Sequence, residues 1–370
     1  MVSDAFLTRH LEIYSTAIIL FFCGQAPSIA KENSKSVPSI SMPVFYATNR
    51  MRTTARHTPV YSKQRRTLPG LEYGECQVTI SGKDVDFDER RDIALGWHKK
   101  TKKVRKVEVD KQKSQSSTEK SFFEELNRRA KDRDRVILFV HGYKSTLDGA
   151  LAIGARLESV FHAPVVIFSW PSSQQYRGYM KDECNIEWSL PHFKRLLAKM
   201  EENVGADKLV LVAHSMGNRL AVWSLRDRAE LALCQKRTNS KFPDVVLTSP
   251  DIDTGTFKNY AEDVCSNAEE TWVLTSSKDN ALRASKFLHK RRRLGMPGPD
   301  GVDIYWGQPP EVKGMRTIEF SAIDKGLVGH SIQHSLIYNL SKDGKPGVGL
   351  RLKDREQDDY KWEQVEVVKN

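Results

Sequence analysis

The chain has 370 residues, of which 39% are hydrophobic and 28% are charged, and its formal net charge at pH 7 is +11. These fractions are those of a soluble globular protein with one large α/β domain or two small ones, and they exclude a disordered or fibrous chain. The excess positive charge lies in three clusters, at Lys99–Lys113, Arg128–Arg135 and His289–Arg293. No aromatic platforms separate them on a common face, so the pattern predicts solvated faces and loops and no nucleic-acid partner.

The N-terminal segment has the features of a signal peptide. Arg9 and His10 precede Ile13–Gly24, an apolar stretch of the right length for the central region of such a peptide but too short for a membrane span. Small residues follow at Ser28–Ala30, where a signal peptidase would cleave. Residues 1–30 are therefore predicted to direct export to the periplasm or medium, without a stable span in the mature chain. If this segment is instead a disordered tail, the protein is cytoplasmic.

The cysteines do not form a metal-binding pattern. None belongs to a CxxC motif or a Cys/His cluster, so we expect no structural zinc, and no other metal or cofactor. Removal of the first 30 residues leaves four cysteines and room for one or two disulfides. The five are Cys23, Cys76, Cys184, Cys234 and Cys265.

The segment before the main domain and the first elements of that domain differ in composition. Residues 31–42 are rich in Ser, Lys and Pro, which predicts a linker. Val44–Thr48 and Glu75–Ile80 have strand composition and are predicted to form an antiparallel edge of a sheet. Lys99–Lys120 contains few apolar residues, which predicts a flexible basic insertion.

The rest of the chain alternates strands and helices, which is typical of a mostly parallel sheet covered by helices on both faces. We expect one α/β domain over residues 43–353 and a polar C-terminal tail over 354–370. The predicted strands are Val136–Val140, Val165–Trp170, Leu209–Ala213, Val245–Thr248, Trp272–Thr275 and Thr317–Phe320, and helical patterns follow at Leu147–Phe161, Ile186–Met200 and Asn218–Arg226.

The stretch Lys208–Ala221 has the pattern of a nucleophile elbow. A buried strand, a tight turn and a helix follow one another, with Ser215 at the apex of the turn. Such a turn crowds the strand against the helix, so the residues two before and two after the serine must be small. Ala213 and Gly217 meet this requirement. The context favours a nucleophilic serine over an ordinary turn serine.

A serine nucleophile needs a base and an acid that orients the base. Asp279 follows the strand Trp272–Thr275, and His330 lies beyond the last predicted strand. The resulting chain order Ser, Asp, His is the one expected after such an elbow. Ser215, Asp279 and His330 are therefore the predicted catalytic triad.

Three further residues compete for the roles of acid and base. Asp251 and Asp253 end the strand after the elbow and are competing acids, although their position favours shaping the pocket wall or capping the helix near Thr254. His334 is the competing base. A glycine directly before His330 favours a loop that presents the His330 ring.

The oxyanion of a tetrahedral intermediate needs backbone donors. The N–H of Met216 is one candidate, because it follows the nucleophile at the start of a helix. The N–H of Tyr143 is the second candidate, because Gly142 lets the loop after Val136–Val140 come close to the serine.

With these residues assigned, the sequence resembles the bacterial α/β-hydrolase family DUF900, over roughly Pro43–Leu340. The resemblance implies an α/β-hydrolase fold and an esterase-like or lipase-like activity, and it supports Ser215, Asp279 and His330. The stretches that carry it are Val44–Arg50, Phe139–Tyr143, Ala213–Arg219, Ser249–Asp253 and Gly329–Ser331.

The main hypothesis is a serine hydrolase that cleaves a carboxylic ester of a small or lipid-like acyl group. An amidase, a thioesterase or an acyltransferase would use the same triad. A hypothesis from another class is a non-catalytic module in which the basic segments bind an anionic polymer, and it predicts salt-dependent binding that does not require Ser215.

Overall fold

Apolar-rich segments of five to eight residues form the centre of the sheet, as buried parallel strands require. The computed structural model describes residues 39–53, 61–81, 106–296, 312–324, 330, 332, 334–346, 350–357 and 360–368. Within them the central strands pair in parallel in the order β11-β10-β9-β8-β6-β7, and each predicted strand is confirmed. Their bounds are β6 Val136–Val140, β7 Val165–Ser169, β8 Leu209–His214, β9 Phe242–Thr248, β10 Ala268–Thr275 and β11 Met315–Glu319.

The antiparallel edge is also confirmed. β1 (Ser39–Thr48) lies parallel to β7 and antiparallel to β4 (Glu72–Ser81), and β4 pairs with β5 (Lys106–Ser117). A separate two-stranded sheet joins β2 (Arg50–Arg52) to β3 (Tyr61–Arg65). The first residues of the domain therefore extend the parallel sheet beyond β7.

The predicted linker and the predicted flexible insertion both contain strands, so these predictions were wrong where the structure describes the residues. The predicted linker 31–42 ends early, because β1 begins at Ser39 and its hydroxyl residues alternate with Ile40 and Met42 against β4. The predicted insertion 99–120 contains β5, in which Val107 and Val109 pair with Ile80 and Val78. Charged residues before, between and after these valines (Lys106, Glu108 and Asp110) are typical of an edge strand and not of a disordered loop.

The segment 354–370, predicted to be a polar C-terminal tail, also contains strands. β12 (Leu350–Gln357) and β13 (Tyr360–Val367) form an antiparallel hairpin, and β13 joins the sheet beside β11. Val365 is fully buried between polar neighbours, so one face of a charged strand reaches the core. The domain therefore extends to Val367. The predicted signal peptide lies outside the described residues.

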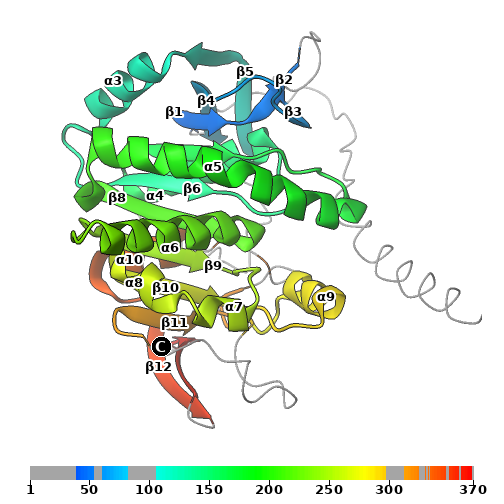
Figure 1. Cartoon of the computed structure of the whole chain (residues 1–370), viewed down its shortest axis with the longest axis vertical. Coiled ribbons are helices and arrows are strands. Elements are labelled where there is room, and N and C mark those ends of the chain that lie inside the picture. Colours follow the sequence, from blue (N-terminus) through cyan, green and yellow to red (C-terminus); the bar gives the residue numbers. More distant parts are fainter. Residues whose placement is uncertain are drawn as a thin grey trace, which may run out of the picture. The chain divides into compact units, whose positions relative to one another are not determined.

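Helices cover both faces of the sheet (Figure 1), which confirms the predicted α/β architecture. α4 (Leu147–Phe161) and α10 (His334–Asp343) pack on one face, and α3 (Glu119–Ala130), α5 (Tyr179–Val204), α6 (Asn218–Cys234) and α8 (Ala261–Ser266) pack on the opposite face. α7 (Thr254–Lys258) and α9 (Asn280–His289) follow β9 and β10.

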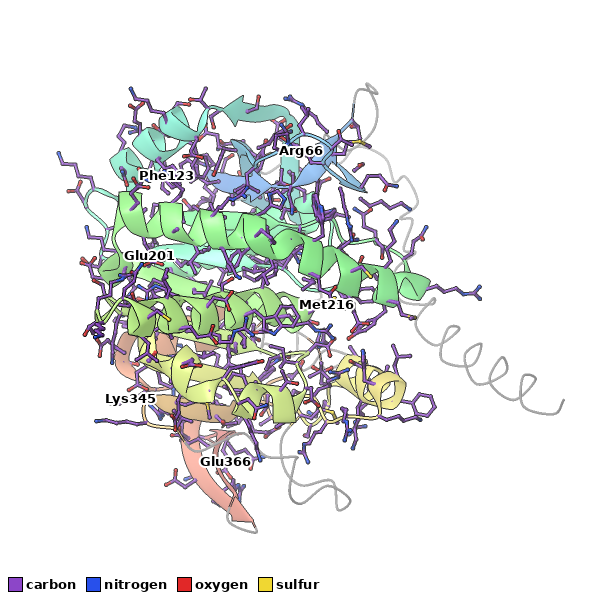
Figure 2. All side chains as sticks on the ribbon, in the orientation of Figure 1. Arg66, Phe123, Glu201, Met216, Lys345 and Glu366 are labelled. Carbon is purple, nitrogen blue, oxygen red and sulfur yellow. The ribbon has the colours of Figure 1, made fainter. Side chains whose placement is uncertain are left out.

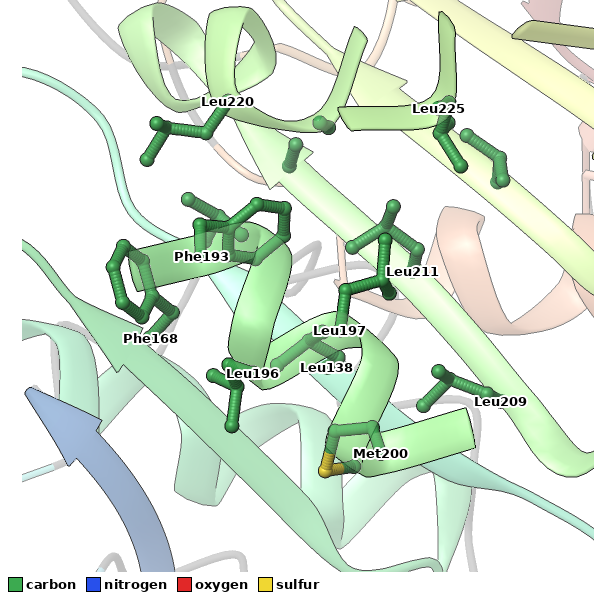
Figure 3. Packing of buried hydrophobic residues seen from close by; sticks show 14 of the residues in the cluster. Leu138, Phe168, Phe193, Leu196, Leu197, Met200, Leu209, Leu211, Leu220 and Leu225 are labelled. Carbon is green, nitrogen blue, oxygen red and sulfur yellow. The ribbon is translucent and has the colours of Figure 1, made fainter. Parts of the chain in front are cut away.

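The core next to the elbow strand is closely interdigitated. In Figure 3, Phe193, Leu197 and Met200 of α5 lie over Leu138 of β6 and Leu211 of β8, and all five are 3% exposed or less. This apolar layer fixes the carboxyl end of β8, where the serine lies. No helix of the described residues is long and apolar enough to cross a membrane.

Two of the basic clusters contain arginines that are half-buried or buried, which the prediction of solvated faces did not anticipate. Arg129 pairs with Glu158 and Arg135 pairs with Asp244, and each carboxylate is largely buried. Arg293 is only 3% exposed. A guanidinium can be buried in this way when acceptors surround it. No disulfide joins any cysteines among the residues that the structure describes.

Candidate active site

Ser215 lies at the turn between β8 and α6, in a backbone conformation that ordinary residues avoid. Its φ is 52°, in the left-handed region. This conformation costs a residue other than glycine on the order of 1–3 kcal/mol. A short 3-10 helix, Ser215–Gly217, joins the strand to α6. Figure 2 labels Met216 at the end of the sheet where the parallel strands finish, the same end as α9 in Figure 1. This is the geometry that the elbow pattern predicts.

The elbow is in tight contact with the loop after β6. A Cβ added to Gly142 would lie 2.7 Å from Cβ of Ser215 and 3.0 Å from the carbonyl oxygen of His214, which no real side chain tolerates. A Cβ on Gly217 would overlap the carbonyl oxygen of His141. Both glycines therefore permit close approach, and the loop that carries Tyr143 lies directly against the serine turn.

The structure brings together the predicted acid and base. Nδ1 of His330 donates to Oδ2 of Asp279 over 2.6 Å. The second oxygen of Asp279, Oδ1, accepts from the backbone N–H of Leu282 over 2.8 Å and so caps α9. The carboxylate of Asp279 therefore caps α9 and pairs with the histidine at the same time.

His330 also lies next to the elbow. Its ring packs against that of His214, the residue before Ser215, with centroids 4.7 Å apart. Burial alone would lower the pKa of His330, but the charge and hydrogen bond of Asp279 outweigh it, so the pKa lies above its usual value. The imidazolium is therefore stabilised at this position.

Asp251, one of the two competing acids, is engaged elsewhere. Its Oδ1 accepts from Ser285 Oγ over 2.7 Å, and its Oδ2 accepts from the hydroxyl of Tyr179. Nε of Arg293 lies 3.3 Å from Oδ1, and Arg219 donates to the backbone carbonyl. Burial would raise the pKa of Asp251, but Arg219 and Arg293 hold it below its usual value. This buried anion ties together α5, α6 and α9.

Asp253 and His334 both lie at the starts of helices. Asp253 caps α7, because Oδ1 accepts from the N–H of Thr256 over 2.7 Å. That is the capping role expected of it. His334 is the first residue of α10. No group of three or more His, Cys, Asp or Glu side chains in the described part of the chain is placed to bind a metal ion.

Sequence reasoning missed a buried pair next to the loop after β6. Arg50 is fully buried, and its guanidinium donates to Oγ of Ser169 and to the carbonyl of Ser145, each over 2.8 Å. It also lies 3.3 Å from Nε2 of His141. Burial lowers the pKa of Arg50 to about 9, so it remains a cation at pH 7. In the sequence, the only signal for Arg50 is its place in a stretch that carries the family resemblance.

The protonation of His141 follows from its neighbours. Its Nδ1 is 2.9 Å from the carbonyl oxygen of Gly142, which can only accept, so Nδ1 carries the proton. Burial and the adjacent Arg50 lower the pKa of His141 to about 3, so the ring is neutral and its Nε2 accepts from Arg50. Trp170 stacks on this ring and donates to the His141 carbonyl. The Gly142 carbonyl therefore has a fixed direction.

Three solved structures resemble parts of this chain. The HSL-homolog EstE7 from a metagenome library is 12% identical with a TM-score of 0.26, and the match covers 42% of this chain and 63% of that one. A Pyrobaculum calidifontis esterase is 13% identical with a TM-score of 0.24, and the match covers 57% of this chain and 64% of that one. An arylesterase is 16% identical with a TM-score of 0.25, and the match covers 50% of this chain and 57% of that one. The chain thus spans less than two thirds of each of them. A comparison with curated proteins gave no match.

The match to a family model is more extensive. Residues 114–339, more than half of the chain, match a family described as "Alpha/beta hydrolase of unknown function (DUF900)". The matched segment includes the elbow, the Asp279–His330 pair and the loop after β6 that carries Gly142 and Tyr143. The sequence resemblance is thereby confirmed, and the chain belongs to the DUF900 family of α/β hydrolases.

Proposed function

We propose that this protein is a serine hydrolase that cleaves carboxylic esters. Ser215 is the nucleophile, His330 takes its proton and returns it to the leaving alcohol, and Asp279 orients the ring and stabilises its cation. Water then attacks the acyl-enzyme by the same route and releases the acid. The observation that supports this most is the 2.6 Å bond between His330 and Asp279, next to a serine at φ 52°.

The proposed oxyanion donors are the N–H groups of Tyr143 and Met216. The Gly142–Tyr143 peptide is trans, so its C=O and N–H point in opposite directions. Because His141 binds the carbonyl oxygen of Gly142, the N–H of Tyr143 is turned the other way, out of the buried side of the loop. The N–H of Met216 begins the turn into α6 and adds the favourable end of a helix dipole.

A covalent probe and a substrate series test this proposal. A fluorophosphonate should label the wild-type protein on the peptide that contains Ser215. Ester, thioester and amide forms of one acyl chain should then be compared, and the ester should give the highest kcat/KM. Absence of labelling would remove the proposal, whereas a preference for the thioester or the amide would keep the triad and change the reaction class.

The pH profile is expected to have its acid limb above pH 6.5. Only neutral His330 can accept the serine proton, and its pKa is raised from 6.5 by Asp279, so kcat/KM should fall as the pH drops through that raised pKa. In Asp279→Asn the remaining effect of burial should move the limb to lower pH. Asp132→Asn, at an exposed position, is the control and should leave it unchanged. A wild-type limb below pH 6.5 would contradict this assignment.

Arg50→Lys is expected to lower kcat more than it raises KM. Lysine keeps the charge but cannot donate in the forked geometry that joins Ser169, Ser145 and His141. We expect kcat to fall about 10-fold to 100-fold, less than the roughly 10²–10³ lost with an oxyanion donor.

The control for this effect is Arg52→Lys, at an exposed position two residues away. Both variants should be assayed well below their melting temperatures, so that lost stability is not mistaken for lost rate. Equal kcat values for the two would show that Arg50 contributes to folding and not to the position of the oxyanion loop.

A further inference from the structure

Helix α9 presents large apolar side chains to solvent. Leu282 and Ser285 face the protein interior, while Phe287 and Leu288 are 74% and 53% exposed. The outer face of a surface helix ordinarily carries polar residues, so the exposure of Phe287 and Leu288 departs from the usual pattern. Met180, in the first turn of α5, is 71% exposed.

These three residues belong to adjacent elements. The ring of Tyr179 lies 5.3 Å from the ring of His289, between centroids, and His289 is bound to Glu183 over 2.8 Å. The start of α5 and the end of α9 are therefore in contact. We call Met180, Phe287 and Leu288 the α9 patch.

The α9 patch is surrounded by positive charge. Residues 280–296 contain no Asp or Glu, and Glu183 is already paired with Arg219 and His289. Nζ of Lys290 lies 4.0 Å from the centroid of the Phe287 ring, so cation and aromatic ring share one site. The exposed or half-exposed Lys and Arg residues within four positions of these three residues in the chain are Arg177, Lys181, Arg283, Lys286, Lys290 and Arg291.

We propose that the α9 patch docks on the surface of a bilayer that contains anionic phospholipids. Phe287, Leu288 and Met180 would enter the boundary between headgroups and acyl chains, and the basic residues would meet lipid phosphates. An anionic bilayer offers hydrocarbon and negative charge together. A nucleic acid or an anionic polysaccharide offers no hydrocarbon, and a second copy of this patch would bring like charges together.

This docking surface lies close to the proposed chemistry. α9 begins at Asp279, whose carboxylate binds His330, and the helix continues outward to Phe287. Docking would therefore bring the end of the sheet that carries Ser215 toward the lipid surface. The inference goes beyond the proposed function and does not depend on it, because Ser215→Ala should bind vesicles as the wild type does.

Co-sedimentation with vesicles tests the proposal on the full chain. Wild type should bind phosphatidylcholine vesicles containing phosphatidylglycerol at physiological ionic strength, and pure phosphatidylcholine much less. The double variant Phe287→Ser/Leu288→Ser should bind about tenfold more weakly or worse, because the inserted apolar area is lost. The triple variant Lys286→Gln/Lys290→Gln/Arg291→Gln should also bind about tenfold more weakly or worse.

A matched control is available at the far end of α6. Leu231 and Leu233 are 51% and 79% exposed, and α6 runs back from the elbow, so its last turns lie away from the patch. Leu231→Ser/Leu233→Ser should bind vesicles like wild type. The melting temperature of the α9 double variant should be close to that of wild type, which tests that the variant is folded.

Several outcomes would overturn the inference. Absence of wild-type binding to anionic vesicles is the plainest. Equal losses in the α9 and α6 double variants would show that exposed leucines act without regard to place. Retained binding in the α9 double variant, with loss only in the triple variant, would indicate attraction to any anionic polymer. A wild-type dimer in sedimentation velocity that the α9 double variant abolishes, without vesicle binding, would assign the patch to a second copy.

Discussion

Ser215→Ala should abolish ester turnover while leaving the fold intact. In a well-studied serine hydrolase, loss of the nucleophile costs on the order of 10⁶-fold in kcat, and we expect a loss of similar size here. The contacts that hold the turn use the backbone carbonyl of Ser215, which accepts from Asn218 Nδ2 over 2.8 Å and from the N–H of Asp251 over 3.2 Å. Both survive the substitution. Turnover of p-nitrophenyl esters and the melting temperature are the measurements.

Ser249→Ala is the matched control for this substitution. Ser249 is also a fully buried serine, it also has a positive φ, 43°, and it follows the neighbouring parallel strand β9. Its substitution should leave turnover and fluorophosphonate labelling close to wild type. Equal labelling of wild type and Ser215→Ala would show that the probe reacts elsewhere, and the nucleophile would have to be sought outside the elbow.

Asp279→Asn should lower kcat on the order of 10⁴-fold without a comparable loss of stability. The value comes from the best-studied triad, where the amide presents the wrong tautomer of histidine to the serine. Asparagine is as good an N-cap as aspartate, so the bond to the Leu282 N–H that starts α9 should persist. Turnover and melting temperature measured on one preparation separate the two functions of this carboxylate.

The two aspartates after β9 provide controls, one expected to lower stability and the other expected to change little. Asp251→Asn removes a buried anion between Arg219 and Arg293, so it should lower the melting temperature strongly and turnover far less than Asp279→Asn does. Asp253→Asn keeps a capping side chain at α7 and should change both little. A collapse of turnover in either, with a modest effect in Asp279→Asn, would move the acid to the end of β9.

The sequence predicted the elements whose signal is local. Leu209–His214 is a strand buried on both faces, so its apolar run is unbroken, and the turn at Ser215 adds small residues on each side. Edge strands have no such signal. β5 and β13 are rich in charged and polar residues, and only their pairing with β4 and β11 shows that they are strands, so they were assigned to a flexible insertion and a polar tail.

Long-range polar contacts were beyond the sequence for a different reason. Arg50 and His141 are 91 positions apart, and neither stretch indicates that a cation is buried beneath the glycine of the oxyanion loop. The pairing of His330 with Asp279 was expected, because catalysis requires the combination. The hydrogen bonds that Tyr179 and Ser285 donate to Asp251 were not expected. They join helices, and the sequence does not indicate which buried acceptor makes them.

The position of β1 determines how far the chain can be shortened from its N-terminal side. The segment that matches the family begins at residue 114, yet Phe45–Thr48 pairs with Val166–Ser169 of β7, and Arg50 follows directly. A chain started at residue 114 would leave β7 as an open edge, ready to pair with another molecule, and His141 would lose its cation. The segment that matches the family is therefore shorter than the sheet to which it belongs.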